Sequence, residues 1–371
     1  MKKIILLLAI FSCAAFVHAA QTVRVQLAEN LKSAQIKTSG KVYIQALNST
    51  KRYKVSKSDT LNAWIVSKGK IQLGALTTGS PIIITPSSGV QLTFQKNTYT
   101  GKLYLIPSGS TLSVVEHTDL ENYLLGVLPY EMSHTWPLEA LKAQAVAART
   151  YTKMQLKEDK SDFDLYNDVR SQMYKGSGKV YDSVRKAVTA TRGQVLTYKD
   201  NLFNTYYHAN CGGATDDAKI WTGSKEPTIK PLQGVSCKTD SHSKSYSWNA
   251  TVPLKSINSF VNQNGLSGSV KKIKIAERTR TKRAVTLQFT TAKGSKTLSC
   301  AKFRLAVGPS LLKSCKITSI SAKSSGFAFA GNGYGHGIGM CQDGAKGMAE
   351  KGKNYKQILA HYFPSSDLKT L

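Results

Sequence analysis

The stretch Tyr123–Tyr151, YLLGVLPYEMSHTWPLEALKAQAVAARTY, constrains the fold of this chain more than any other segment. It places one acidic residue, Glu131, in a short predicted loop ahead of a helix that is apolar on one face. The helix is predicted to begin at Pro137, because the first turn of a helix leaves the N–H that proline lacks unpaired in any case. Its buried stripe is predicted to consist of residues at helical spacing, namely Leu138, Leu141, Ala145, Ala148 and Thr152.

Glu131 is a candidate general acid because its neighbours are largely apolar. Tyr130, Met132 and Trp136 flank it. A carboxyl group in such surroundings has a raised pKa and can donate a proton near neutral pH. The plainer alternative is that Glu131 favours the positive end of the following helix. The residue types alone leave both interpretations open.

Two further motifs accompany this segment. Tyr207–Thr215 reads YHANCGGAT, and Gly331–Phe363 begins GNGYGHGIGMCQDG. In this order, the three blocks resemble the stage II sporulation protein D and amidase-enhancer family of cell-wall enzymes. The resemblance extends from roughly Thr111 to the C-terminus. The family usually has serine where this chain has Cys341, so the role of that residue stays open.

The resemblance implies that the protein is a lytic transglycosylase of peptidoglycan glycan strands. The glutamate of the family's Glu-Met motif, here Glu131, would act first as acid and then as base. The 6-hydroxyl group of N-acetylmuramic acid would attack its own anomeric carbon and leave a 1,6-anhydro end. The implied substrate is glycan stripped of its stem peptides, and no cofactor is required for this chemistry.

The residues around Glu131 also bear on this reaction. Ordinary glycosidases use two carboxyl groups. We find no second acidic residue in a comparably enclosed setting in the three motif blocks. The amidase-enhancer branch of the family suggests an alternative function: a non-catalytic cell-wall binding module that enhances a partner amidase.

The N-terminus reads as a secretory signal peptide. Lys2 and Lys3 precede an apolar core, Ile4–Phe16, and cleavage is predicted near Ala19 or Ala20. The apolar core is too short to span a bilayer, and we expect no integral membrane segment after cleavage. The mature protein is therefore expected in the periplasm or cell wall.

The net charge of +29 favours polyanionic partners. For an exported protein, the nearest of these are cell-wall glycans and anionic envelope polymers. We do not expect nucleic acid as a partner, because export separates the protein from it and no compact basic run with interleaved aromatic residues is present.

The remaining pattern predicts an α+β fold. After the signal peptide at residues 1–20, residues 21–110 contain short strand-like segments and form a predicted β-rich region of unassigned function. Residues 111–371 mix helices with antiparallel strands, without a βαβ rhythm, and form the predicted catalytic domain. Within it, Asp119–Leu125 is predicted to be a short helix, capped by Asp119 and stopped by Gly126. Asn354 and Gln357 form a capping-box pattern for the last helix.

Four residues are candidates for binding substrate. His336 lies between two glycines, which let the backbone approach a ligand closely, and it would either orient a sugar or be a structural histidine on a tight strand. Gln342 is a candidate hydrogen-bond partner of a sugar. Arg149 would bind a muramic acid carboxylate or hold an acidic partner in the core. Tyr207 would stack on a sugar ring or pack in the core.

Two histidines and two cysteines suggest a closed, structural zinc site. The four residues are His208, Cys211, Cys237 and His242. Some members of the resembled family hold zinc in this region. A Cys211–Cys237 disulfide is the alternative, and it suits an exported protein. Cys300 and Cys315 are close enough in sequence to form another disulfide.

Overall fold

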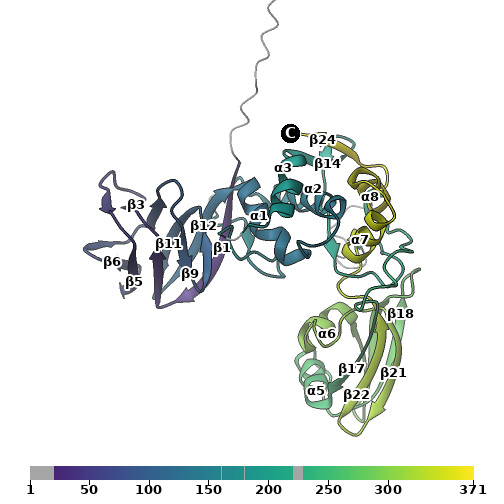
Figure 1. Ribbon diagram of the computed structural model, residues 1–371. Coiled ribbons are helices and arrows are strands. Elements are labelled where there is room, and N and C mark those ends of the chain that lie inside the picture. The colour runs from purple at the N-terminus through teal and green to yellow at the C-terminus, as the bar shows by residue number, and fades with distance from the viewer. Residues whose placement is uncertain (1–20, 160, 179, 220–228) are drawn as a thin grey trace, which may run out of the picture.

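The computed structural model describes residues 21–159, 161–178, 180–219 and 229–371 (Figure 1). The predicted signal peptide, residues 1–20, lies outside the described residues. The fold is α+β, as predicted: β-rich sheets come first, and helices with antiparallel strands follow. Three hydrophobic cores run through the chain, the first under the N-terminal sheets and the others behind the later helices and strands.

Two sheets share the first core. The strands of the larger sheet are, in spatial order, β13 (Leu165–Tyr166), β1 (Thr22–Leu31), β12 (Thr111–Asp119), β11 (Lys102–Ser108), β8 (Ile82–Pro86), β3 (Val42–Ala46) and β4 (Tyr53–Val55). The strands of the smaller sheet are β10 (Asn97–Tyr99), β9 (Leu92–Phe94), β2 (Ser33–Thr38), β5 (Asp59–Ser67), β6 (Lys70–Leu73) and β7 (Leu76–Thr78). Alternation buries one face, as in β2, where Ala34, Ile36 and Thr38 point inward.

Strand β12 connects these sheets to the rest of the chain. It begins just after the predicted boundary at residue 110 and pairs along its length with β1 and β11. It then leads directly into the first helix. The division of the chain at residue 110 stays a prediction.

A layer of helices surrounds α2 (Leu138–Gln155) in the middle of the molecule (Figure 1). The elements packed against it are α1 (Leu120–Glu131), α3 (Asp182–Ala190), α7 (Gln342–Glu350), α8 (Tyr355–Tyr362), β14 (Gln194–Tyr198) and β15 (Asn201–Leu202). Most of the predicted stripe of α2 is buried, but Leu138 is exposed at the first turn. Strand β24 (Asp367–Thr370) pairs with β14, and the capping box predicted for α8 is confirmed. None of the helices in the described ranges is long and apolar enough to cross a membrane.

Helix α1 is longer than predicted. Asp119 caps it as expected, by accepting hydrogen bonds from the backbone of Glu121 and Asn122. The predicted stop at Gly126 is wrong, because the helix continues to Glu131. A Cβ atom at Gly126 would lie 2.5 Å from both the Gly176 carbonyl oxygen and the Tyr174 ring. This glycine therefore permits close packing rather than ending the helix.

The third core belongs to residues 247–332, in the lower part of Figure 1. Its elements are β17 (Ser247–Pro253), α5 (Leu254–Gln263), β18 (Val270–Arg278), β19 (Ala284–Thr291), β20 (Gly294–Ser299), α6 (Cys300–Val307), β21 (Ile317–Lys323) and β22 (Gly326–Asn332). Cys300 and Cys315 are free thiols, so the suggested disulfide between them is not formed. After β22, a glycine-rich loop leads to β23 (Met340–Cys341), which pairs in parallel with β16 (Tyr207–His208).

One buried carboxyl group in the first core makes stability depend on pH. Glu116 is fully buried, accepts hydrogen bonds from the Tyr174 hydroxyl and the Gly101 backbone, and has a pKa raised to about 7 by burial. Because the folded state holds this proton more tightly than the unfolded chain, its contribution to stability is full below pH ~4.5 and is lost as pH rises through ~7. Glu116→Gln should therefore gain about 3 kcal/mol over the wild type at pH 8 and little at pH 4. Urea unfolding at both values tests this; an equal effect at the two values would contradict it.

Candidate active site

Glu131 lies at the C-terminal end of α1, and not in a loop as predicted. One carboxylate oxygen, Oε1, accepts a hydrogen bond from the Met173 backbone N–H at 2.8 Å, and Oε2 accepts one from Nε2 of Gln342 at 3.4 Å. Burial raises the pKa of Glu131, and the two hydrogen bonds oppose the rise only in part. The end of α1 is the negative end of a helix, and the first turn of α2 begins beyond Pro137. The helix-dipole alternative therefore does not account for this glutamate.

Two of the three sequence blocks meet at this carboxyl group. Gln342 opens α7, and its side-chain amide lies between Glu131 and the buried Gln144 of α2, whose Oε1 is 3.5 Å away. The middle block holds the start of α7 in place, because β16 pairs with β23 just before Gln342. The pairing of the candidate sugar ligand Gln342 with Glu131 could not be read from either block alone.

The segment Tyr166–Gly178 contributes a part of the site that the sequence analysis missed. Its Met173 backbone N–H binds Glu131, and the buried Gln172 donates hydrogen bonds to the hydroxyl groups of Tyr123 and Thr152. Every residue except proline has a backbone N–H group, so the sequence does not show which of them will bind a given side chain. Only the dense packing of this segment against α1, seen at Gly126, places it here.

Aromatic rings and lysines occupy the segments around Glu131. Nζ of Lys175 is 5.2 Å from the ring centre of Tyr130, which is 44% exposed. Nζ of Lys346 is 5.5 Å from the ring centre of Trp136. Tyr130 precedes Glu131 directly, and Lys346 follows Gln342 by one turn of α7. Rings with nearby cations can bind the apolar face of a sugar and an acidic group on it.

Arg149 does not belong to this site, and its assignment as a substrate ligand is wrong. Its guanidinium group forms two hydrogen bonds with Glu121, from Nε at 2.8 Å and from Nη2 at 2.7 Å, and the residue is 1% exposed. Glu121 lies ten residues before Glu131 on α1, which corresponds to about 15 Å along the helix. Arg149 instead holds an acidic partner in the core, which was the alternative role that the sequence left open.

The ion pair between Arg149 and Glu121 should matter for stability. Removing one partner of a buried pair leaves an uncompensated charge, so Arg149→Met is expected to cost about 3–5 kcal/mol in the free energy of unfolding. Lys142→Met on the same helix is the control, because its pair with Glu139 is partly exposed and should contribute less than about 1 kcal/mol. Denaturant unfolding compares the two variants; equal losses would contradict this role of Arg149.

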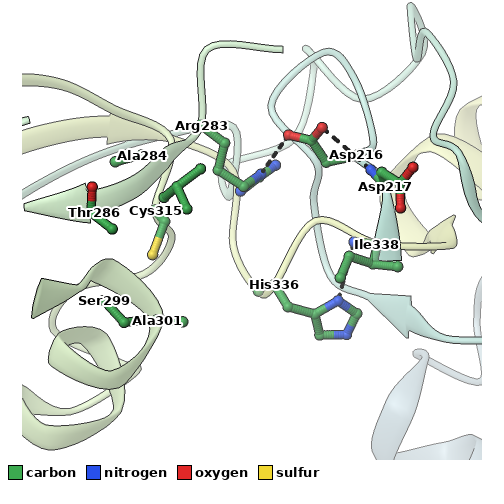
Figure 2. A pocket seen from close by; sticks show the side chains of 12 residues that line it. Asp216, Asp217, Arg283, Ala284, Thr286, Ser299, Ala301, Cys315, His336 and Ile338 are labelled. Atoms are coloured by element: carbon green, nitrogen blue, oxygen red, sulfur yellow. Dashed lines mark hydrogen bonds and ion pairs between the residues drawn. The ribbon is translucent and has the colours of Figure 1, made fainter. Parts of the chain in front are cut away.

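His336 and Tyr207 are both engaged by other parts of the protein. His336 donates from Nε2 to the Tyr207 carbonyl at 2.9 Å. Its Nδ1 accepts from the Ile338 N–H, 3.1 Å away (Figure 2). Burial lowers the pKa of His336 to about 4, so the ring is neutral. The Tyr207 hydroxyl donates to Gln172 at 2.7 Å. The polar atoms of both side chains already have hydrogen-bond partners among the described residues. The structural alternatives that the sequence left open therefore describe both residues.

A cluster of sulfur and oxygen ligands lies beside α7. The candidate ligand atoms of Cys211, Cys237, Asp240 and Cys341 all lie within 4.8 Å of one another, and all four residues are buried. Hydrogen bonds from the neighbouring thiols lower the pKa of Cys237 well below the ordinary value for a thiol. Oδ1 of Asp240 is buried without a hydrogen-bond partner among the described residues. This cluster could hold a metal ion.

The predicted ligand set shares Cys211 and Cys237 with this cluster, but neither of its histidines belongs to it. His208 donates from Nδ1 to the Ile338 carbonyl and does not belong to the cluster, and His242 is exposed. Asp240 and Cys341 take their places. The alternative disulfide is not formed, since Cys211 and Cys237 are free thiols. The departure from serine at Cys341 was a signal in the sequence that could have pointed to this ligand.

The donor set suits zinc. Three thiolates and one carboxylate are ligands that Zn²⁺ accepts in closed, four-coordinate sites. Sγ of Cys341 accepts hydrogen bonds from the backbone N–H groups of Cys211 and Gly344, each at 3.3 Å. Such donors stabilise negative charge on sulfur and orient the ligand.

Comparisons with known families cover most of the chain. A family model described as stage II sporulation protein matches residues 108–198. A model described as a domain of unknown function (DUF8618) matches residues 223–339, which include the part with the third core.

Relatives with similar sequences extend this result. An uncharacterised protein of Brachyspira hyodysenteriae is 36% identical over 73% of this chain and 72% of its own length. The protein named amidase enhancer in Bacillus subtilis is 31% identical over 66% of this chain, which spans only 40% of that longer relative. Stage II sporulation protein D of Bacillus subtilis is 30% identical over 68% of this chain and 75% of its own length. On this similarity, the chain belongs to the stage II sporulation protein D family.

Proposed function

We propose that this protein is a lytic transglycosylase that cuts peptidoglycan glycan strands after N-acetylmuramic acid. The observation that carries the proposal is the desolvated carboxyl group of Glu131, held by Met173 and Gln342. Burial raises the pKa of Glu131 and the two hydrogen bonds lower it, and no second carboxylate contributes to this shift among the described residues. One carboxyl group suffices for a reaction in which the substrate itself supplies the nucleophile.

In the proposed reaction, the nucleophile is the 6-hydroxyl group of the substrate. Protonated Glu131 donates its proton to the glycosidic oxygen, and the bond between that oxygen and the anomeric carbon breaks. The resulting carboxylate then takes the proton of the muramic acid 6-hydroxyl group as its oxygen bonds to the anomeric carbon. The products are a 1,6-anhydro end and a new 4-hydroxyl end, Glu131 is protonated again, and no water is consumed.

The neighbours of Glu131 have supporting roles in this proposal. Burial keeps the carboxyl group protonated at a higher pH than that of an ordinary glutamate, and the Met173 N–H then stabilises the carboxylate that forms after proton transfer. The rings of Tyr130 and Trp136 would stack on sugars, and Lys175 and Lys346 would attract muramic acid carboxylates. Free carboxylates occur on glycan stripped of its stem peptides, which is the substrate we propose.

Export to the periplasm or cell wall is part of the proposal. The basic start and short apolar core of the N-terminal segment support it. The net charge of +29 would concentrate the protein on anionic wall polymers. We also propose that the cluster of Cys211, Cys237, Asp240 and Cys341 holds a structural zinc ion, which would fix the start of α7 and so the position of Gln342.

The second candidate function is enhancement of a partner amidase without catalysis, which the name of one relative suggests. Mass spectrometry of purified, stem-stripped glycan incubated with the protein separates the two functions. The proposal expects fragments with 1,6-anhydro ends from the protein alone. Unchanged glycan, together with faster amide cleavage when an amidase is added to intact peptidoglycan, would favour the alternative.

A further inference from the structure

A small cavity lies where the part of the chain with the third core meets the glycine-rich loop (Figure 2). Its volume is about 90 Å³, which corresponds to about three molecules of liquid water. Part of its wall is apolar and is formed by Ala284, Val285, Ala301 and Ile338. Glu131 does not line this cavity, so any ligand bound in it would be distinct from the substrate of the proposed reaction.

Arg283 gives this cavity a buried cation with unused donors. The residue is 3% exposed, and its Nη2 donates to the Cys211 carbonyl at 3.0 Å. Its Nε forms an ion pair with Oδ2 of Asp216 at 3.8 Å, a distance too long for a hydrogen bond (Figure 2). Neither Nε nor Nη1 has a hydrogen-bond partner among the described residues. Leaving buried donors unpaired is costly, so these two donors call for an acceptor from outside the chain, either water or an anion.

The direction of this guanidinium group is fixed by packing. A Cβ atom at Gly337 would lie 2.2 Å from Cζ of Arg283, so the loop backbone rests directly on the group. Gly337 has a φ of +85°, a conformation that glycine adopts readily. Arg283 therefore cannot turn toward another acceptor without displacing the loop.

The start of α6 faces the same cavity. Ser299, the N-cap, and Ala301 in the first turn both line it. The Ser299 hydroxyl accepts from the Lys302 N–H, which leaves earlier N–H groups of the turn without intrahelical partners. A helix N-terminus attracts anions through these groups and the helix dipole. Arg283 and α6 thus favour negative charge from two independent elements.

A second buried arginine, Arg304, lies near the cavity but does not line it. Arg304 is 6% exposed, donates from Nε to the Lys313 carbonyl, and forms no ion pair within the described ranges. Asp216 is the buried carboxylate near Arg283, and its Oδ2 already accepts hydrogen bonds from the hydroxyl groups of Thr279 and Thr281. Counted with Asp217 on the rim, these four side chains carry no net charge, so the case for an anion rests on the unused donors of Arg283.

Three other titratable residues line the cavity: Cys315, His336 and Asp217. A hydrogen bond from Cys300 and the charges of Arg283 and Arg304 lower the pKa of the Cys315 thiol. His336 contributes no charge, since burial lowers its pKa to about 4. Asp217 is the opposing group: it is half-buried on the rim, and its Oδ1 accepts from the Lys219 N–H. Its negative charge opposes anion binding, and more strongly for a multiply charged ligand.

We propose that this cavity binds a small monocarboxylate with a short apolar stem, such as propionate, through Arg283 and the first turn of α6. The carboxylate accepts hydrogen bonds from Nε and Nη1 of Arg283, and the stem lies against the apolar wall. The size of the cavity restricts the ligand to a few heavy atoms or to a carboxylate-bearing group of that size on a larger molecule. This site lies on the loop that leads to β23 and Gln342.

Isothermal titration of the full-length mature protein with sodium propionate tests the proposal. Chloride and phosphate titrations at matched ionic strength serve as comparisons, since neither ion has an apolar stem. Arg283→Gln should weaken propionate binding roughly tenfold or more, as expected for loss of a hydrogen bond to a charged group. Arg280→Gln is the matched control, because this arginine lies on the same turn but is exposed.

A second variant covers the case in which Arg283→Gln does not fold. Ala301→Leu keeps Arg283 and fills the cavity from its apolar side, so it should also abolish binding. Saturable binding of propionate that Arg280→Gln retains and the other two variants lose is the expected result. The proposal is overturned if the wild type shows no saturable binding, if chloride or phosphate binds as tightly as propionate, or if Ala301→Leu binds like the wild type.

Discussion

Replacing Glu131 with glutamine is expected to reduce the rate of anhydro-product formation by roughly 10²–10⁴-fold, the usual contribution of general acid–base catalysis. The substitution keeps the shape of the side chain and an oxygen for the Met173 N–H, but it removes the transferable proton. Glu139→Gln is the control, because Glu139 on α2 is partly exposed and pairs with Lys142. The measurement is the initial rate of release of anhydro fragments from stem-stripped glycan. Equal rates in the wild type and Glu131→Gln would contradict the account.

The pH dependence of the same rate follows from the raised pKa of Glu131. The reaction starts from the protonated acid, so the rate should fall as pH rises through this pKa. Because burial moves that pKa upward, the fall should come at a higher pH than for an ordinary glutamate near 4.5. A profile that falls at the ordinary value would show that the carboxyl group is not desolvated during the reaction.

Loss of zinc is expected to lower the stability of the protein, and this is the second large effect that we predict. If free zinc exceeds its dissociation constant about a thousandfold, binding to the folded state contributes about 4 kcal/mol to stability. Cys237→Ser should remove the metal and most of this contribution, since it deletes one of four ligands. Cys300→Ser is the control, because Cys300 is also a buried free thiol but lies outside the cluster. Elemental analysis and thermal unfolding with and without a chelator measure both quantities.

Absence of zinc from the purified protein would instead support the alternative disulfide between Cys211 and Cys237. A wild-type protein purified with zinc present that contains no metal, and whose mass is lower by two hydrogens, would have joined two thiols instead. In that case Cys237→Ser and Cys300→Ser would not differ in metal content, and a reducing agent rather than a chelator would lower the stability.

Local sequence rules predicted much of the fold. Asp119 and Asn354 cap their helices as expected, because a capping side chain binds backbone within its own turn. The antiparallel strands expected among residues 111–371 are confirmed, for example by the pairing of β18 with β19. The prediction at Gly126 was wrong, because a glycine that ends a helix and one that admits a neighbouring backbone look alike in a sequence.

In the candidate site, the sequence also failed to predict which distant residues come into contact. Glu131 and Gln342 were both singled out, but their contact joins residues 211 positions apart. Arg149 was misassigned because its partner Glu121 is 28 residues away and reaches it only through the packing of α1 on α2. The metal cluster combines residues from three distant segments, so the nearby His242 was chosen in place of Cys341. Pairings of this kind depend on tertiary packing, which spacing alone does not encode.

The central claim is that Glu131 is the only catalytic carboxyl group and that the muramic acid 6-hydroxyl group, and not water, attacks the anomeric carbon. Digestion of stem-stripped glycan in water enriched in oxygen-18, followed by mass spectrometry of the fragments, tests this claim most directly. The account predicts anhydro ends that carry no label, because no water enters the reaction. Labelled reducing ends, heavier by one water molecule than anhydro ends, would show hydrolysis and contradict the single-carboxyl mechanism.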